Sequence, residues 1–221
     1  MEIWKEFEDM LFPEKGICFF CGEYSDEISQ YICHQCKSRI EYLNKDIPFE
    51  FSYIDRIAYS LFYSNFIREH IFSYKYHGRG YLYKPFGEIL INTFLEKFSP
   101  EDIDIITNVP IHRRKKAMRG FDQSELLAVY MSQKMNIHNS RKNLLRVKET
   151  KSQNKLNKEQ RRMNMEGAFQ VRKKEEFGGK RILILDDIIT TGITFEESAK
   201  VLKDCGAEKV YGLALTSGMK F

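Results

Sequence analysis

Residues 182–194 read Ile182-Leu183-Ile184-Leu185-Asp186-Asp187-Ile188-Ile189-Thr190-Thr191-Gly192-Ile193-Thr194, and they carry the strongest structural signal in the chain. The four apolar residues from Ile182 to Leu185 are typical of a buried central strand. Asp186 and Asp187 follow directly, at the carboxyl end of that strand. Ligands of open α/β sheets bind at this end. Two carboxylates there can accept hydrogen bonds from neighbouring ribose hydroxyls or help to hold a hydrated magnesium ion.

The second half of this stretch predicts a phosphate site. Thr190, Thr191 and Thr194 supply hydroxyls, and Gly192 and Ile193 complete the turn into a following helix. Backbone N–H groups and the positive end of the helix dipole then point at one spot, which suits an anion. A plain strand-to-helix turn is the alternative, but a cap needs a single side chain of this kind. Here two acids, three threonines and a glycine occur within nine positions.

Two common nucleotide-binding motifs do not describe this stretch. A Walker-type loop would end in Gly-Lys-Ser/Thr, and a dinucleotide fingerprint would need three spaced glycines. Residues 194–204 instead continue as a helix stopped by Gly206, and residues 209–215 form another apolar strand. Strand, helix and strand in this order imply a right-handed parallel crossover. We therefore expect an α/β fold with a central, mainly parallel sheet.

Upstream segments supply the remaining elements of this fold. Residues 65–76, 83–98 and 120–135 have the apolar spacing of helices. Residues 103–109 form a short apolar strand that ends at Pro110, and residues 51–63 have the aromatic and β-branched content of strands. These elements fit around the predicted sheet.

Three further segments are expected to be irregular. Residues 42–48 read as a short connector, and the basic run Arg113-Arg114-Lys115-Lys116 is expected in a loop. Residues 148–158 are rich in lysine and contain a single apolar residue, Leu156. Such a segment cannot bury a face of its own, so we expect a mobile loop or a loosely held helix there.

Four of the five cysteines form two C-x2-C pairs near the N-terminus: Cys18, Cys21, Cys33 and Cys36. Two such knuckles allow four thiolates to bind a zinc ion tetrahedrally. A site with four protein ligands has no open position for catalysis, so the zinc would be structural. Two redox pairs or chance thiols are the alternatives. His34 is expected to be an exposed knuckle residue, and Cys205 a packed helix residue.

Composition limits the class of protein. The 221 residues are 43% hydrophobic and 30% charged, as in a globular protein, and no run is long and apolar enough for a membrane span. The first residues lack the basic head of a signal peptide, so we expect a cytoplasmic protein without membrane insertion. The net charge of +4 is too small to argue for nucleic acid by itself. Residues 146–162, however, hold seven basic residues and two acids.

Residues 185–194 resemble the 5-phosphoribosyl-1-pyrophosphate (PRPP) loop of type I phosphoribosyltransferases. Other segments extend the resemblance to the ComF family, whose members are similar to amidophosphoribosyltransferases. They are Lys75-Tyr76-His77-Gly78, Val109-Pro110, Arg119-Gly120-Phe121-Asp122-Gln123, the spaced set Arg146, Gln153, Leu156, Arg161, Asn164 and Phe169, and the N-terminal cysteines. The resemblance covers nearly the whole chain. It implies a zinc-ribbon-like module at residues 1–45 and a Rossmann-like phosphoribosyltransferase domain at residues 46–221.

The resemblance also implies roles for individual residues. Asp186 and Asp187 would meet the ribose hydroxyls of PRPP, bound together with Mg2+, and Thr190, Thr191, Gly192, Ile193 and Thr194 would hold the 5-phosphate. Ile111, His112 and Arg113 occupy the place of the pyrophosphate loop. Arg146 begins the basic segment that takes the place of the mobile catalytic loop. Arginine in a water-poor site would stabilise the leaving pyrophosphate as its charge develops.

Two positions leave questions for the structure. Asp122 stands where the ComF pattern has asparagine, and it would either face the ligand or cap the helix that follows. The acceptor would be bound by a variable segment that covers the active site, called the hood. Residues 46–100 and the cysteine module are the only parts of the chain that could form it.

Three functions fit this sequence. The first is an enzyme that transfers the phosphoribosyl group of PRPP to an amine, a base or water. The second is a non-catalytic sensor of PRPP or nucleotides that acts in DNA uptake, the process to which the resemblance to ComF points, with a competence helicase as a partner. The third is a single-stranded DNA binder that uses the zinc module and the basic segments. In that case Phe19, Phe20, Tyr24 and Tyr31 would stack on bases, although they are better explained as the core of the module.

Overall fold

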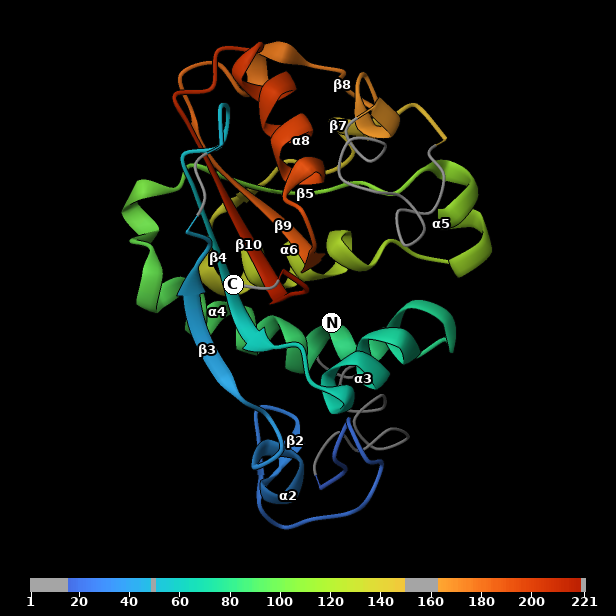
Figure 1. Cartoon of the computed structure of the whole chain (residues 1–221). Coiled ribbons are helices and arrows are strands. Elements are labelled where there is room, and N and C mark those ends of the chain that lie inside the picture. Colours follow the sequence, from blue (N-terminus) through green and yellow to red (C-terminus); the bar gives the residue numbers. More distant parts are fainter. Residues whose placement is uncertain (1–15, 49–50, 150–162, 220–221) are drawn as a thin grey trace, which may run out of the picture.

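The computed structural model of the chain describes residues 16–48, 51–149 and 163–219. Its centre is a six-stranded sheet with the strand order β3-β4-β10-β9-β5-β6 (Figure 1). The strands are β3 (Tyr42–Asp46), β4 (Arg56–Phe62), β5 (Ile105–Asn108), β6 (His138–Asn139), β9 (Arg181–Ile189) and β10 (Lys209–Ser217). Every neighbouring pair is parallel except β3 with β4. The expected α/β fold with a mainly parallel sheet is confirmed.

Helices cover both faces of this sheet. Helices α3 (Asn65–Tyr76), α4 (Tyr83–Lys97) and α6 (Gln123–Met135) contribute to the core on one face, and α8 (Ile193–Lys203) packs on the other. The unit formed by β9, α8 and β10 is the predicted strand-helix-strand crossover, and its two strands are parallel. Figure 1 shows α8 on the side of the strands opposite α4.

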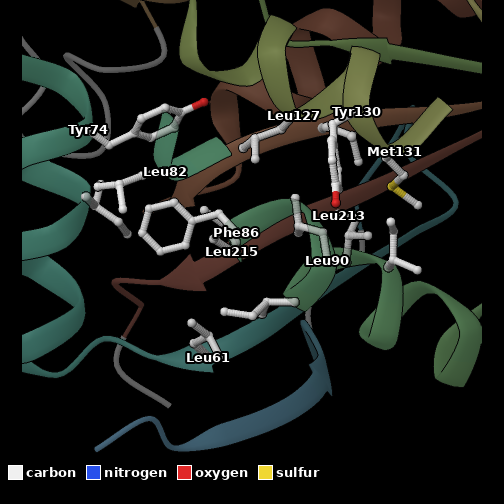
Figure 2. Close-up of a cluster of buried hydrophobic side chains, with 14 of the residues drawn as sticks. Leu61, Tyr74, Leu82, Phe86, Leu90, Leu127, Tyr130, Met131, Leu213 and Leu215 are labelled. Carbon is white, nitrogen blue, oxygen red and sulfur yellow. The ribbon is translucent and has the colours of Figure 1, made fainter. Parts of the chain in front are cut away.

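Strand β9 is buried on both faces because its apolar side chains alternate between two cores. Leu183 and Leu185 belong to the core shared with α4 and α6, and Ile182 and Ile184 belong to the core shared with α8. All four are completely buried. Figure 2 shows part of the first core, where side chains from α3, α4 and α6 meet those of β4 and β10. This packing fixes the carboxyl end of β9 at the site described below.

Smaller elements complete the chain. They are β1 (Ile28–Ser29), β2 (Ile32–Cys33), α2 (His34–Lys37), η1 (Gly80–Leu82), η2 (Pro100–Asp102), α5 (Arg113–Arg119), β7 (Leu144–Arg146), β8 (Phe169–Val171) and η4 (Lys174–Glu176). Strands β1 and β2 pair within the cysteine-containing module, and β7 pairs antiparallel with β8.

Two expected irregular segments are regular in the structure, and those predictions were wrong. The expected connector contains β3, which pairs antiparallel with β4 at the edge of the sheet. The basic run forms helix α5, which His112 caps at its start and Gly120 ends with a φ of +82°. The expected helix from residue 120 therefore starts at Gln123, after that turn. Most of the lysine-rich segment falls in 150–162, outside the described residues.

The cysteine-containing module is not an isolated unit. Phe20 is 2% exposed and its ring packs against Phe66 and His70 of α3 and Phe86 of α4. Both ring nitrogens of His70 lie within hydrogen-bond distance of backbone carbonyls, those of Phe66 and Phe20. Phe20 therefore extends the core of the main domain, and Phe19 and Tyr31 pack against it, whereas Tyr24 is 73% exposed. Figure 1 shows the module, with β2 and α2, next to α3.

Candidate functional site

Strand β9 delivers two carboxylates to the centre of a cleft. Asp186 and Asp187 lie near its carboxyl end, and Asp186 is opposite Ala214 of β10. The backbone N–H of Asp187 donates to Oδ1 of Asp186 at 2.8 Å. Asp187 is 6% exposed, yet both acids line a cleft of about 670 Å³. This volume lies within the range of small-molecule sites, about 300–1,000 Å³.

The same cleft gathers most of the residues that the sequence analysis assigned to PRPP. Thr190, Gly192 and Thr194 line it beside the acids, and Ile111 and Arg146 come from other elements. Thr191 and Ile193 belong to the same turn but do not line the cleft, and Ile193 packs against the core beneath α8.

Gly192 determines how the chain enters α8. It is the N-cap residue of the helix with a φ of +76°, a conformation that favours glycine. A Cβ atom at this position would lie 2.4 Å from Cε1 of Phe51. Glu196 holds that neighbouring segment in place, because its carboxylate accepts hydrogen bonds from the backbone N–H groups of Ser52 and Tyr53. The first N–H groups of a helix have no partner within the helix, so this entrance can bind an anion.

A lysine that sequence reasoning did not assign is paired with the acids. Nζ of Lys75, from the last turn of α3, lies 2.5 Å from Oδ2 of Asp187, and both side chains are largely buried. Burial alone would lower the pKa of Lys75, but the carboxylates of Asp187 and Asp186 outweigh it and raise that pKa. Burial, and then repulsion by Asp187, raise the pKa of Asp186 well above its ordinary value. The ammonium group thus compensates two crowded carboxylates.

Helix α5 brings further cations to the cleft. Lys115 and Arg119 line it, four residues apart on one face of the helix. Burial, and then the positive charges of Arg146 and Arg119, lower the pKa of Lys115. Neither residue was assigned to the site from the sequence, because the basic run was expected in a loop. In a loop, two residues four positions apart do not share a face. A helical reading of residues 113–119 would have found them.

Arg146 lies at the end of β7 and reaches the cleft from another side. Its Nη2 donates to Sδ of Met165 at 3.3 Å, and its guanidinium lies 5.7 Å from the centre of the Phe169 ring. Burial lowers the pKa of Arg146, while Asp186 and Asp122 act in the opposite direction. Lys115, Arg119 and Arg146 therefore form a crowded set of positive charges that an anionic ligand would relieve.

In the segment after Pro110, one residue lines the cleft and the next helps to start helix α5. Ile111 lines the cleft, and its backbone N–H donates to Oδ2 of Asp122 at 3.0 Å. His112 is buried, and its Nδ1 accepts from the backbone N–H of Arg114 at 3.4 Å, at the start of α5. Arg113 is exposed. Neither His112 nor Arg113 lines the cleft.

Asp122 caps α6. Its Oδ1 accepts from the backbone N–H of Glu125 at 3.2 Å and from Oγ of Ser124 at 2.9 Å. The residue is 4% exposed, and burial raises its pKa. Asp122 does not line the cleft, so of the two roles considered for it the structure shows the cap.

The four cysteines form a cluster that fits a structural metal. Their sulfur atoms all lie within 4.8 Å of one another, and the Sγ atoms of Cys21 and Cys33 are 3.9 Å apart. A tetrahedral zinc site with bonds of about 2.3 Å places its sulfurs roughly 3.8 Å apart. Burial would raise the pKa of Cys18, but backbone N–H groups, including that of Cys33, lower it to about 7. His34 is exposed, as expected, and is not part of the cluster.

Comparisons with known proteins agree with this geometry. Residues 122–217 match the family model described as phosphoribosyl transferase domain. Competence protein F of Haemophilus influenzae is 37% identical over 114 residues, which are 50% of this chain and 50% of that protein. DNA utilization protein YhgH of Escherichia coli K12 is 33% identical over 107 residues, 48% of this chain and 46% of that protein. The matches thus span about half of the length of these curated relatives.

Solved structures give weaker similarities. A glutamine PRPP amidotransferase from B. subtilis, complexed with ADP and GMP, has a TM-score of 0.40 and 19% identity over 58% of this chain and 25% of that chain. In the part of the chain that the structure describes, no helix is long and apolar enough to cross a membrane. The family model and the relatives agree with the motifs from residue 185 to residue 194, so residues 122–217 form a phosphoribosyl transferase domain and the chain is similar to the ComF-like type I phosphoribosyltransferases.

Proposed function

We propose that the chain binds PRPP, or a closely related ribose phosphate, in the cleft at the carboxyl end of β9. One observation carries the proposal: two carboxylates, a helix entrance and several cations line the same cleft. Carboxylates suit ribose hydroxyls, the helix entrance suits a 5-phosphate, and the cations suit a pyrophosphate. The described residues thus match a ligand that has an anionic group at each end of a sugar.

Each part of the cleft has a proposed role. Asp186 and Asp187 bind the ribose hydroxyls, and the segment Thr190–Thr194 binds the 5-phosphate through its hydroxyls and N–H groups. Arg146 stabilises the departing pyrophosphate. In the pyrophosphate loop, Ile111 faces the ligand and Lys115 and Arg119 supply positive charge, while His112 and Arg113 shape the start of α5.

We further propose that PRPP binds together with Mg2+. Oxygen ligands such as the carboxylates of Asp186 and Asp187 fit this ion, which would neutralise the pyrophosphate. Nζ of Lys75 lies 2.5 Å from Oδ2 of Asp187, so a cation held by Asp187 would compete with this ion pair.

The reaction class we propose is phosphoribosyl transfer or hydrolysis in the cytoplasm, with a role in DNA uptake or use. The names of the relatives, competence protein F and DNA utilization protein YhgH, support that role. A competence helicase and single-stranded DNA belong to this proposal as partners. The aromatic residues of the cysteine module give little support to DNA binding by base stacking, because Phe20 is buried and the rings of Phe19 and Tyr31 pack together. A binding module that senses PRPP without turnover is the second candidate. The residues of the cleft account for binding of PRPP whether or not an acceptor also binds.

Release of pyrophosphate from PRPP and Mg2+ tests the proposal, with ammonia, free nucleobases or water as acceptor. The enzyme is expected to release pyrophosphate with one of them, and Asp187→Asn to abolish release. The matched control is Glu175→Gln, an exposed acid outside the cleft, which should leave release unchanged. Binding of PRPP without release would favour the sensor, and absence of binding would contradict both candidates.

A further inference from the structure

One wall of the cleft presents aromatic side chains that the binding of a sugar phosphate does not explain. Arg68, Phe72 and Tyr76 lie four residues apart on α3, so they share one face of the helix, and all three line the cleft. Phe72 is 51% exposed and Tyr76 is 55% exposed. The core-facing side of the same helix buries Ile67 and Tyr74 completely. The exposed rings are therefore not part of the core.

The aromatic wall, formed by Phe72 and Tyr76, is held in place. The two ring centres are 4.9 Å apart. The guanidinium of Arg119 lies 4.7 Å from the centre of the Tyr76 ring, and its Nη2 donates to the Tyr76 hydroxyl at 2.9 Å. Fixed aromatic faces open to a cleft are typical surfaces on which flat heteroaromatic rings stack.

An unsatisfied amide lies beside this wall. Gln123 is 2% exposed and lines the cleft, and its Oε1 accepts from Nη1 of Arg119 at 2.7 Å. Among the described residues, Nε2 of Gln123 has no hydrogen-bond partner. A buried donor without a partner is costly, and such groups in folded proteins call for a specific explanation. A carbonyl oxygen or ring nitrogen of a ligand would satisfy this donor.

We propose that the aromatic wall and Gln123 bind the acceptor of the phosphoribosyl group, and that this acceptor is a nucleobase or a similar flat heteroaromatic ring. This inference rests on the proposed sugar-phosphate site, because both surfaces belong to the same cleft. Ammonia or water would use neither the rings nor the amide. In the transfer, a ring nitrogen forms a bond to C1 of the ribose. The bond from C1 to the pyrophosphate oxygen breaks, pyrophosphate leaves with the electron pair, and the proton of the ring nitrogen passes to solvent.

Product binding tests the inference without requiring turnover. Calorimetry would compare ribose 5-phosphate with the 5′-monophosphates of adenosine, guanosine, cytidine and uridine. At least one nucleotide is expected to bind about tenfold more tightly than ribose 5-phosphate, because stacking of a base on aromatic side chains is favourable by that order. The double variant Phe72→Ala/Tyr76→Ala is expected to remove this difference and to leave the affinity for ribose 5-phosphate unchanged.

Phe62→Ala/Tyr81→Ala is the matched control, because these rings are 50% and 45% exposed but do not line the cleft. It should keep the preference for the nucleotide, whereas Gln123→Met should reduce it. The inference is wrong if no nucleotide binds more tightly than ribose 5-phosphate, or if the preference survives loss of Phe72 and Tyr76. Preference for a single-stranded oligonucleotide over every mononucleotide would also overturn it. Failure of ribose 5-phosphate and PRPP to bind at all would instead contradict the proposed function.

Discussion

Lys75, Asp186 and Asp187 form a charge cluster in which no member is independent of the others. The ammonium of Lys75 pairs with Asp187 at 2.5 Å, and burial and Asp187 together raise the pKa of Asp186. Burial of Asp186 beside Asp187 is a cost to the folded state, because both the burial and the neighbouring charge make Asp186 harder to ionise. The cluster therefore couples stability to pH.

Asp186→Asn is expected to stabilise the protein at pH 8 by about 1 kcal/mol, a size typical of single stabilising substitutions. The folded pKa of Asp186 lies above its ordinary value of 3.8, so the stability it contributes is present below that value and is lost as the pH rises through the folded pKa. The advantage of the variant should vanish near pH 3.8. Urea unfolding of both proteins across this range measures the difference, with Glu175→Gln as control. A variant that is less stable than the wild type at pH 8 would refute this interpretation.

Lys75→Met is expected to lower the free energy of unfolding at neutral pH by about 3 kcal/mol, because it leaves buried carboxylates without their cation. Asp187→Asn removes the other partner of the same ion pair. The double variant should therefore cost less than the sum of the single variants, by about 1 kcal/mol or more. Chemical denaturation of the four proteins gives this coupling energy. Strict additivity would mean that the ion pair contributes nothing.

Single residues also mark how far sequence reasoning reaches. Asp186 and Asp187 could be found because they follow a strand that is apolar along its whole length. Lys75 could not be assigned, although it stands in one of the motifs of the resemblance, because only the packing of α3 brings it to β9. The aromatic wall was missed for the same reason, since exposed rings on a helix indicate a site only when the cleft beside them is known.

Among the secondary-structure elements, the buried strands and long helices could be predicted from the sequence, whereas strand β3 and helix α5 could not. Strands β9 and β10 and helices α3, α4 and α8 lie where their apolar patterns place them. Strand β3 is polar, and pairing with β4 rather than its own pattern makes it a strand. Helix α5 buries no residue, so its sequence has no apolar face to reveal it.

Gly192→Ala tests whether the turn into α8 must be glycine. A Cβ atom would meet Phe51 at 2.4 Å on a backbone with a φ of +76°. Gly179 is the matched control, because its φ is +66° and a Cβ atom there meets nothing within 4 Å. Gly179→Ala should cost about 1 kcal/mol, and Gly192→Ala about 2 kcal/mol or more.

Thermal unfolding measures both costs, and titration with PRPP measures the function of the turn. Gly192→Ala should weaken binding of PRPP and Gly179→Ala should not, because the first lines the cleft and the second does not. Equal effects of the two substitutions on binding would show that the turn has no part in the site.

The cysteine module and the cleft share helix α3. Phe20 lies between Cys18 and Cys21 in sequence and packs on α3, the helix that carries Lys75 and the aromatic wall. The predicted division between residues 45 and 46 falls inside β3, a strand of the main sheet. The sequence marked the module through its cysteines but held no sign of the surface on which it packs.

The cysteine cluster is expected to bind one zinc ion per chain, measured by mass spectrometry of the purified protein. Cys33→Ser should lose the metal and lower the melting temperature by about 5–10 °C, because the module and the helices beside it share a core. Cys205→Ser should keep the metal, since this residue lies outside the cluster. Loss of zinc without any change in melting temperature would show that the module does not stabilise the main domain.

Calorimetric titration of PRPP with Mg2+ into the wild-type chain and into Asp187→Asn tests whether the carboxyl end of β9 binds a phosphorylated ribose. We predict saturable binding of about one PRPP per chain, weakened at least tenfold in the variant, because a hydrogen bond to a charged group contributes about 1.5–3 kcal/mol. Circular dichroism of the two proteins should be the same. Absence of binding to the wild type, or equal binding by a folded Asp187→Asn variant, would contradict the claim that the carboxyl end of β9 holds a phosphorylated ribose.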